Sequence, residues 1–247
     1  MTASVPVFIY HHVNHHKGDT VTITPEAFAA QMAWLAEHEI RTLSMEELLA
    51  FAAGRFELEG RAVLLTFDDG WRDNYLYAWP VLRRYGLRGT FFLITDRTET
   101  AGEGAVPPPP VWPDHEGAKK LLLGEDGGGV AMAWREVGEM AAEGRCCFYS
   151  HTRSHRRCAG LGGVELAEEL AGSRRLMEAR LGTVCDVLCW PYGSFDDAAI
   201  AAATAAGYRT IFTTEYGRVV PGGDPLRLPR IEAVESLDGF IRELAGN

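Results

Sequence analysis

The chain has 247 residues, of which 47% are hydrophobic, so its length suits one large domain with a sizeable buried core. Its formal net charge of −10 argues against nucleic acid or an anionic membrane as the main partner, whereas it allows a neutral or cationic glycan. No apolar run reaches the roughly 18 residues that a membrane span requires.

The start of the chain and its cysteines bear on location. MTASVPVFIY enters a strand-like run at once, with no basic segment and no cleavage site, and so does not read as a secretory signal. We therefore expect a cytoplasmic protein, or an extracytoplasmic one if a signal sequence has been removed. The five cysteines include no CxxC pair, which favours reduced, structural thiols over a metal role.

Strands and helices are predicted to alternate along the chain. Runs rich in β-branched and aromatic residues predict strands at 5–10, 62–67, 89–94, 145–150, 183–190, 208–213 and 227–232. Helical patterns lie between them at 25–39, 74–86, 132–144, 164–182 and 196–207. Thr24 and Pro25 are suited to begin the first helix, and a glycine ends each of the others. This alternation indicates parallel βαβ units, and about seven of them predict one closed or nearly closed α/β barrel over residues 1–247.

One segment departs from this rhythm. Residues 96–131 contain GEGAVPPPP and GEDGGG and are too long and too rich in glycine and proline for an ordinary connection. We expect a surface excursion, which is either a lid or a tolerated insertion.

Two adjacent carboxylates follow the second predicted strand, in LLTFDDGW. Asp68 and Asp69 would repel each other at a strand end unless a cation or a proton divides their charge. A metal held by one of them would leave the other free to move a proton, whereas the alternative is a helix cap. A second FDD, in SFDDA, suits that alternative, because Ser194 and Asp197 have the spacing of a capping arrangement before an alanine-rich helix.

Two histidines follow another apolar strand, in SHTRSH. His151 and His155 are four residues apart, and with one carboxylate they would form a facial ligand set for a divalent metal. The set favours Zn²⁺, although it would also accept Co²⁺ or Ni²⁺. An HxxxH pair alone is more often two surface histidines, so its meaning depends on the carboxylates.

Two further stretches carry candidate groups. In CWPYGSF, Pro191 and Gly193 predict a tight turn whose backbone N–H could bind an oxyanion, although an ordinary proline turn has the same sequence. In FIYHHVNHH, a strand ends in four histidines that could bind a metal, transfer protons or lie in a solvated loop.

Together, TFDDG, SHTRSH and WPYG resemble the motifs of polysaccharide deacetylases of the NodB-homology type, carbohydrate esterase family 4. The opening VPVFIYHHV and the stretch TPEAFAAQMAWLAEHEIRTLSMEELL resemble the subset that includes poly-N-acetylglucosamine deacetylases. The resemblance covers most of the chain. It implies a distorted (β/α)7-type barrel in a single domain and metal-dependent removal of an N-acetyl, less often an O-acetyl, group from a sugar.

The resemblance also implies roles for individual residues. Asp69, His151 and His155 would be the metal ligands, and Asp68 would be the general base that activates the attacking water. The backbone N–H of Tyr192 would stabilise the oxyanion.

The substrate wall is implied in the same way. Trp190 and Leu188, with Pro191 beside them, would contact the acetyl methyl group or the sugar face.

The sequence departs from the family pattern at two places. The third motif usually carries an Arg that contacts the catalytic Asp, and Cys189 stands at that position. Arg230, at the tip of the last predicted strand, is the best substitute. The family's late catalytic His has no counterpart here, because no His follows His155.

A histidine near the start of the chain can fill the second gap. A closed barrel brings its first and last strands together, and the similar subset carries a His directly after an N-terminal strand Tyr. By that resemblance His11 would protonate the leaving amine. Strand alternation turns His12 to the opposite side, and His15 and His16 are expected in a solvated loop.

Two other functions remain open on the sequence. One is a metal-dependent C–N hydrolase that acts on a small non-glycan amide, and the other is a non-catalytic carbohydrate-binding barrel. Cys189 gives weight to the binding barrel, but the intact Asp68 argues against it, since a binding site needs no base. The absence of G-x-S-x-G and G-x-G-x-x-G motifs disfavours serine-hydrolase and dinucleotide-binding folds. The expected partner is an N-acetylated glycan or amino sugar.

Overall fold

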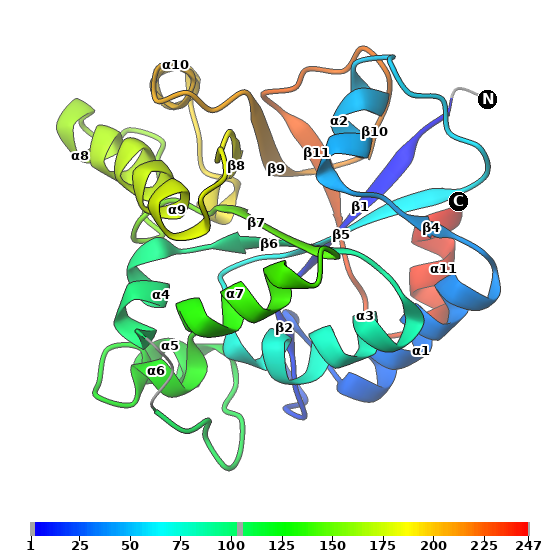
Figure 1. The fold of residues 1–247 in the computed structure, drawn as a ribbon, viewed down its shortest axis with the longest axis horizontal. Coiled ribbons are helices and arrows are strands. Elements are labelled where there is room, and N and C mark those ends of the chain that lie inside the picture. Colours follow the sequence, from blue (N-terminus) through cyan, green and yellow to red (C-terminus); the bar gives the residue numbers. More distant parts are fainter. Residues whose placement is uncertain (1–2, 103–105, 247) are drawn as a thin grey trace.

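Seven parallel strands close into a barrel in the computed structural model, which describes residues 3–102 and 106–246 (Figure 1). The first strand pairs in parallel with both its neighbours, β5 and β11, and this closes the ring. The predicted (β/α)7-type barrel is therefore confirmed. Its strands are β1 (Val5–Tyr10), β5 (Ala62–Phe67), β6 (Gly89–Leu93), β7 (Cys146–Ser150), β8 (Val187–Cys189), β9 (Thr210–Tyr216) and β11 (Leu228–Glu232).

Two strand boundaries differ from the prediction. β8 is shorter than the predicted 183–190, and Val184 in the omitted part is 66% exposed. β9 continues to Tyr216 because Arg230 of β11 pairs with that residue. Four short strands lie outside the ring. β10 (Arg218–Val219) pairs with β1 and β4 (Arg41–Thr42) pairs with β5, whereas β2 (His12–Val13) and β3 (Thr22–Ile23) pair with each other.

Helices pack around the outer side of the barrel (Figure 1), except α2 (Met45–Ala52), whose residues join the cluster inside it. Thr24 caps the first of them, and Gly86 and Gly182 end two others in the left-handed conformation, as expected. Two π-helical turns, Asn74–Ala78 and Glu168–Gly172, lie within the predicted helices 74–86 and 164–182. The α-helices are α1 (Pro25–Glu37), α2 (Met45–Ala52), α3 (Trp79–Tyr85), α4 (Thr95–Ala101), α5 (His115–Leu121), α6 (Gly127–Val130), α7 (Trp134–Ala142), α8 (Gly163–Ala167), α9 (Ser173–Leu181), α10 (Asp197–Ala205) and α11 (Leu237–Ala245).

The second FDD caps α10, but not through the predicted residues. The helix begins at Asp197, so the cap position falls on Asp196, whose carboxylate accepts the backbone N–H of Ala199. Ser194 lies two residues before the cap in an extended backbone conformation, and the predicted pairing of Ser194 with Asp197 is wrong.

Alternation along the strands separates an inner from an outer core. Val5 and Val7 of β1 and Leu64 of β5 belong to a cluster inside the barrel, together with residues of α2. Leu65 and Phe67 belong to the larger cluster between the strands and the surrounding helices. Because side chains alternate along a strand, the positions that continue the inner rows beyond the strand ends point into the mouth of the barrel.

Segment 96–131 packs against the side of the barrel. It contains α4, α5 and α6, and its Trp112, Ala118 and Val130 cluster on Trp71; residues 103–105 lie outside the described part. α5 and α6 lie together near α4 in Figure 1. Within the described residues, no helix combines the length and the hydrophobicity that crossing a bilayer demands.

Candidate active site

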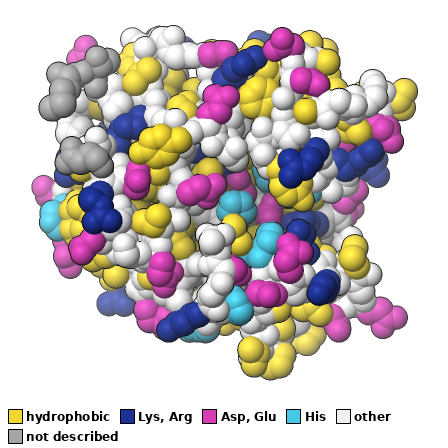
Figure 2. All heavy atoms as spheres, turned by 180° about the vertical axis from the view of Figure 1, so that it is seen from behind, with side chains coloured by type: hydrophobic (Ala, Val, Ile, Leu, Met, Phe, Trp, Pro, Cys, Tyr) yellow, Lys and Arg dark blue, Asp and Glu magenta, His cyan; other side chains and the backbone are white. Residues whose placement is uncertain are grey.

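A cleft of about 420 Å³ opens at the carboxyl ends of the barrel strands. Figure 2 shows histidine side chains gathered near the middle of one face, beside acidic and basic side chains. The residues that line the cleft are His11, Val21, Asp68, Asp69, His115, His151, His155, Arg157, Trp190, Tyr192, Thr214 and Glu232. The cleft therefore contains side chains from the carboxylate pair Asp68 and Asp69, from the histidine pair His151 and His155, from the proline turn and from the opening histidines.

Asp69, His151 and His155 converge on one point of this cleft. The Oδ1 atom of Asp69 lies 3.4 Å from Nε2 of His151 and 3.1 Å from Nε2 of His155. Asp69 Oδ1 is buried and has no hydrogen-bond partner among the described residues. A buried carboxylate oxygen that faces two imidazole nitrogens without a hydrogen bond fits a divalent cation between them.

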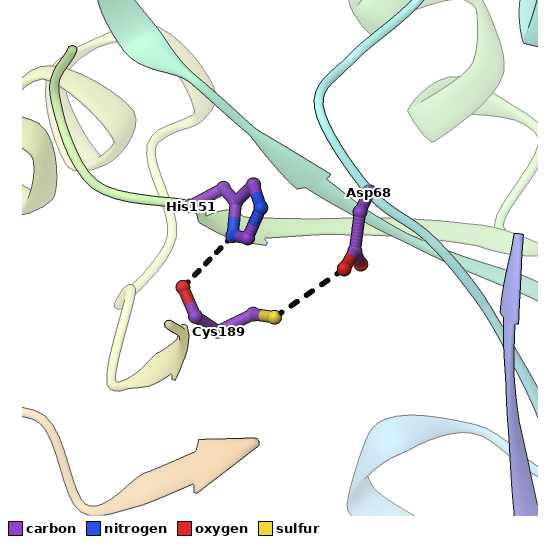
Figure 3. Close-up of side chains that lie close together, drawn as sticks. All are labelled: Asp68, His151 and Cys189. Carbon is purple, nitrogen blue, oxygen red and sulfur yellow. Dashed lines mark hydrogen bonds between the residues drawn. The ribbon is translucent and has the colours of Figure 1, made fainter. Parts of the chain in front are cut away.

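The second nitrogen of His151 is fixed by the backbone (Figure 3). Its Nδ1–H donates to the carbonyl oxygen of Cys189 over 2.8 Å, so Nε2 is the ring nitrogen that faces Asp69. Ligand histidines in metal sites are usually oriented by such a hydrogen bond. Burial lowers the pKa of His155, which also favours its neutral, ligating form.

Asp69 is held as a carboxylate on its other side too. The indole N–H of Trp71 donates to Oδ2 over 3.0 Å, and a guanidinium nitrogen of Arg97 lies 3.6 Å from the same oxygen. Burial alone would raise the pKa of Asp69, but the two histidines and Arg97 lower it well below its ordinary value.

Unusual backbone conformations concentrate at this site. Asp69, Thr152, His155 and Tyr192 have positive φ angles, and among the described residues only Glu39 shares this property without being glycine. Such conformations cost free energy and occur often in functional sites, where surrounding contacts hold them in place.

Asp68 forms a fully buried ion pair with Arg230. Both guanidinium Nη atoms donate to the carboxylate, each over 2.8 Å, and Nε of Arg230 donates to the carbonyl oxygen of Thr213. Burial alone would raise the pKa of Asp68, but the ion pair with Arg230 outweighs it and lowers the pKa to about 2. Asp68 is therefore an ionised carboxylate at neutral pH.

Cys189 lies beside this pair rather than in place of an ion-pair partner. Its thiol donates to Oδ2 of Asp68 over 3.6 Å, the contact drawn in Figure 3, and it accepts a hydrogen bond from Nη2 of Arg230 over 2.9 Å. Asp68, His151 and Cys189 form a second group of potential metal ligands. The guanidinium already occupies this side of Asp68 and repels a further cation, so the group with Asp69 is better suited to a metal.

The proline turn contributes two groups to the cleft. Trp190 and Tyr192 line it, and no hydrogen bond involving the Tyr192 amide is found within the described part of the chain. Gly193 also has a positive φ, and a Cβ there would meet Oγ1 of Thr214 at 2.0 Å, so the turn excludes a larger residue.

Leu188 and Pro191 are not on the cleft wall, contrary to expectation. Both are buried, and neither is among the residues that line the cleft. Leu188 belongs to the outer core, because alternation along β8 turns it toward the helices while its neighbour Cys189 faces the barrel interior.

The opening histidines divide between three environments. His11 lines the cleft, whereas His12 is buried on the other side, as alternation predicted. His12 is 1% exposed and bound to Asp73, so it is a buried polar residue and not part of the solvated loop. His15 is exposed and His16 is half-buried, in the loop where they were expected.

The sequence did not point to five of the residues that line the cleft: Val21, His115, Arg157, Thr214 and Glu232. His115 lines the cleft from the start of α5, inside segment 96–131. Neither a motif nor the end of a barrel strand marks it, so no local signal identified it.

The motif-bearing part of the chain matches a known family model. The polysaccharide deacetylase model matches residues 56–211, which is more than half of the chain. The chain belongs to the polysaccharide deacetylase family. This membership places it among enzymes that remove acetyl groups from carbohydrates.

Relatives of this deacetylase extend the match along the chain. The Bacillus subtilis (strain 168) protein YxkH is 27% identical over 237 residues, which are 96% of this chain and 74% of that protein. The poly-β-1,6-N-acetyl-D-glucosamine N-deacetylase of Staphylococcus epidermidis is 27% identical over 239 residues, which are 90% of this chain and 74% of that protein. The structure of the Streptococcus pyogenes deacetylase PplD in complex with acetate has the same fold, with a TM-score of 0.81, 20% identity and 99% coverage of both chains.

Proposed function

We propose that this deacetylase is a metal-dependent hydrolase that removes an acetyl group, chiefly an N-acetyl group, from a carbohydrate. The observation that carries the proposal is the convergence of Asp69, His151 and His155 on one point, next to the ionised Asp68. Similarity to a deacetylase that acts on poly-β-1,6-N-acetyl-D-glucosamine supports an N-acetylglucosamine substrate.

Asp69, His151 and His155 would hold the divalent metal, for which Zn²⁺ suits the ligand set best and Co²⁺ or Ni²⁺ also fit. The buried Asp69 oxygen without a hydrogen bond and the hydrogen bond that orients the His151 ring support this assignment. When bound, the metal supplies Lewis acidity toward the acetyl carbonyl and the attacking water.

The protein's own groups would move the protons and stabilise charge. Asp68 takes a proton from the attacking water, and its low pKa, set by Arg230, keeps it ionised for this purpose. The backbone N–H of Tyr192 donates to the oxygen of the acetyl carbonyl as negative charge develops there. Trp190 forms part of the wall against which the acetylated sugar lies.

His11 would donate a proton to the nitrogen of the leaving amine. It lines the same cleft as Asp68 and directly follows β1, which pairs with β5, the strand that precedes Asp68. Amide cleavage requires this proton because an unprotonated amine is a poor leaving group.

The proposal is tested by metal analysis of the purified protein together with acetate release from a panel of substrates. The panel contains β-1,6-linked and β-1,4-linked N-acetylglucosamine oligosaccharides, an O-acetylated sugar and small non-glycan amides. We expect one divalent metal per chain and the fastest acetate release from an N-acetylated oligosaccharide. Faster cleavage of the small amides would favour a C–N hydrolase of another class, and metal-loaded protein without any acetate release would favour a binding barrel.

A further inference from the structure

A buried hydrogen-bonded chain leads from the protein interior to the cleft. The carboxylate of Asp73, which is fully buried, lies 2.6 Å from Nδ1 of His12. Nε2 of His12 lies 3.1 Å from Nδ1 of His115. We call these residues the Asp73–His12–His115 chain; it lies outside the group formed by Asp69, His151 and His155.

The carboxylate determines where hydrogens lie along the chain. Asp73 Oδ2 also accepts a hydrogen bond from Nδ2 of Asn14 over 2.7 Å, and a carboxylate can only accept, so His12 must carry a hydrogen on Nδ1. One hydrogen is then shared between Nε2 of His12 and Nδ1 of His115. Whichever of these nitrogens carries it, Nε2 of His115 is the one ring nitrogen of the Asp73–His12–His115 chain that has no hydrogen-bond partner among the described residues.

The surroundings hold both rings in place. His12 stacks on Trp71 with ring centroids 4.3 Å apart, and the backbone N–H of His115 donates to the carboxylate of Asp19. Burying the polar groups of Asp73 and His12 costs free energy that apolar residues of the same shape would not cost. The Asp73–His12–His115 chain ends at His115, which lines the cleft, so Nε2 of His115 is available to a molecule bound in the cleft.

The chemistry of the free nitrogen favours a hydroxyl group as its partner. Burial and the nearby His12 lower the pKa of His115 to about 4, so its ring is neutral near pH 7 and does not attract an anion. A hydroxyl can both donate and accept, so it can pair with Nε2 in either state of the shared hydrogen. Sugar hydroxyls next to an acetamido group are of this kind.

We propose that His115 contacts the substrate and hydrogen-bonds a hydroxyl group of the acetylated sugar, while His12 and Asp73 are positioning residues that orient it. The inference rests on the proposed function, because it names a contact to the same substrate. It assigns segment 96–131 a part in substrate recognition, through the residue that begins α5.

The test compares two substrates in one set of variants. His115→Phe keeps a planar ring but removes both nitrogens, and His15→Phe is the matched control, because the His15 side chain is 59% exposed and does not line the cleft. The substrates are an N-acetylglucosamine oligosaccharide and 4-nitrophenyl acetate, an ester without sugar hydroxyls. We expect His115→Phe to lower kcat/KM for the oligosaccharide about tenfold, as the loss of one hydrogen bond predicts, and to leave ester hydrolysis unchanged. The control should change neither.

Positioning by His12 and Asp73 is tested by non-additivity. His12→Phe and Asp73→Asn should each lower kcat/KM for the oligosaccharide selectively, but neither should lower it further when combined with His115→Phe. Thermal unfolding of each variant identifies any that fail to fold, and Asp73→Asn keeps the shape of the side chain it replaces.

Three outcomes overturn the inference: equal losses on both substrates, no loss on the oligosaccharide, or additive losses in the double variants. A wild-type protein that releases no acetate from any oligosaccharide would remove the proposed function instead. Calorimetric binding of the oligosaccharide would then decide on His115, since equal affinity for the wild type and His115→Phe would overturn its role.

Discussion

Replacing Arg230 should destabilise the protein more than any surface arginine does. The guanidinium is fully buried and donates to the Asp68 carboxylate through both Nη atoms, and it also donates to Thr66, Thr213 and Cys189. Arg230→Met leaves the Asp68 charge buried without its partner. Breaking a buried ion pair in this way costs about 3–5 kcal/mol of unfolding free energy. For a chain of this length, that loss corresponds to a decrease of roughly 6–20 °C in Tm.

The assay is chemical denaturation in the presence of a chelator, so that metal binding does not contribute to the measured free energy. Arg227→Met is the matched control, because Arg227 is 43% exposed and pairs with Asp197 at the surface; we expect it to cost less than about 1 kcal/mol. The double variant Asp68→Asn/Arg230→Met removes both charges and should be more stable than Arg230→Met alone.

Catalysis provides a second readout of the same pair. Without Arg230, burial raises the pKa of Asp68, so the proposed base becomes protonated at a higher pH. The acid limb of the pH–rate profile therefore moves to higher pH. A loss below about 1 kcal/mol in Arg230→Met, or a double variant no more stable than it, would refute the view that an uncompensated buried charge dominates this position.

Three further predictions concern the cleft. Asp69→Ala should abolish metal binding, whereas Asp68→Asn should keep the metal and lose acetate release; metal analysis with the acetate assay separates the two, and near-normal turnover of Asp68→Asn would contradict its role as base. His11→Ala should lower kcat far more than His15→Ala, by about 10²-fold or more, and equal effects would remove the special role of His11. The pKa of the His115 ring, measured by NMR titration, should be about 4, below the ordinary value of 6.5. Between these two pH values the unfolded chain binds more protons at this ring than the folded protein does, so the contribution of His115 to stability falls as the pH is lowered through this window. A titration midpoint at or above 6.5 would contradict the prediction.

The positions of the barrel strands, and the side of the strand that each residue faces, were predictable from the sequence. Each apolar run lies in a strand of the ring, because a strand buried on both faces needs apolar residues at nearly every position. Alternation, which depends only on local backbone geometry, also predicted that His11 and His12 would face opposite sides. The same rule, applied along β8, would have placed Leu188 outside the cleft.

The motifs gave the grouping of the site, and the family pattern pointed to Arg230 as the substitute for the missing Arg beside Asp68, a contact that the structure contains. Asp69, His151 and His155 follow the ends of parallel strands, so they meet at one end of the barrel once it closes. That Arg230 contacts Asp68 through both nitrogens depends on how β9, β11 and β5 lie around the barrel interior, and no local pattern records that distance.

Tertiary structure alone decided the surroundings of His12 and the place of His115. The path of segment 96–131 brings His115 to His12, 103 residues away in the sequence, because its apolar residues pack on Trp71 beside the barrel. Sequence periodicity reports which side of a strand or helix is buried, and it carries no information on where an irregular segment returns. The sequence by itself therefore determined the barrel and the residues at its mouth, whereas the hydrogen-bonded partners of those residues were decided by packing between distant segments.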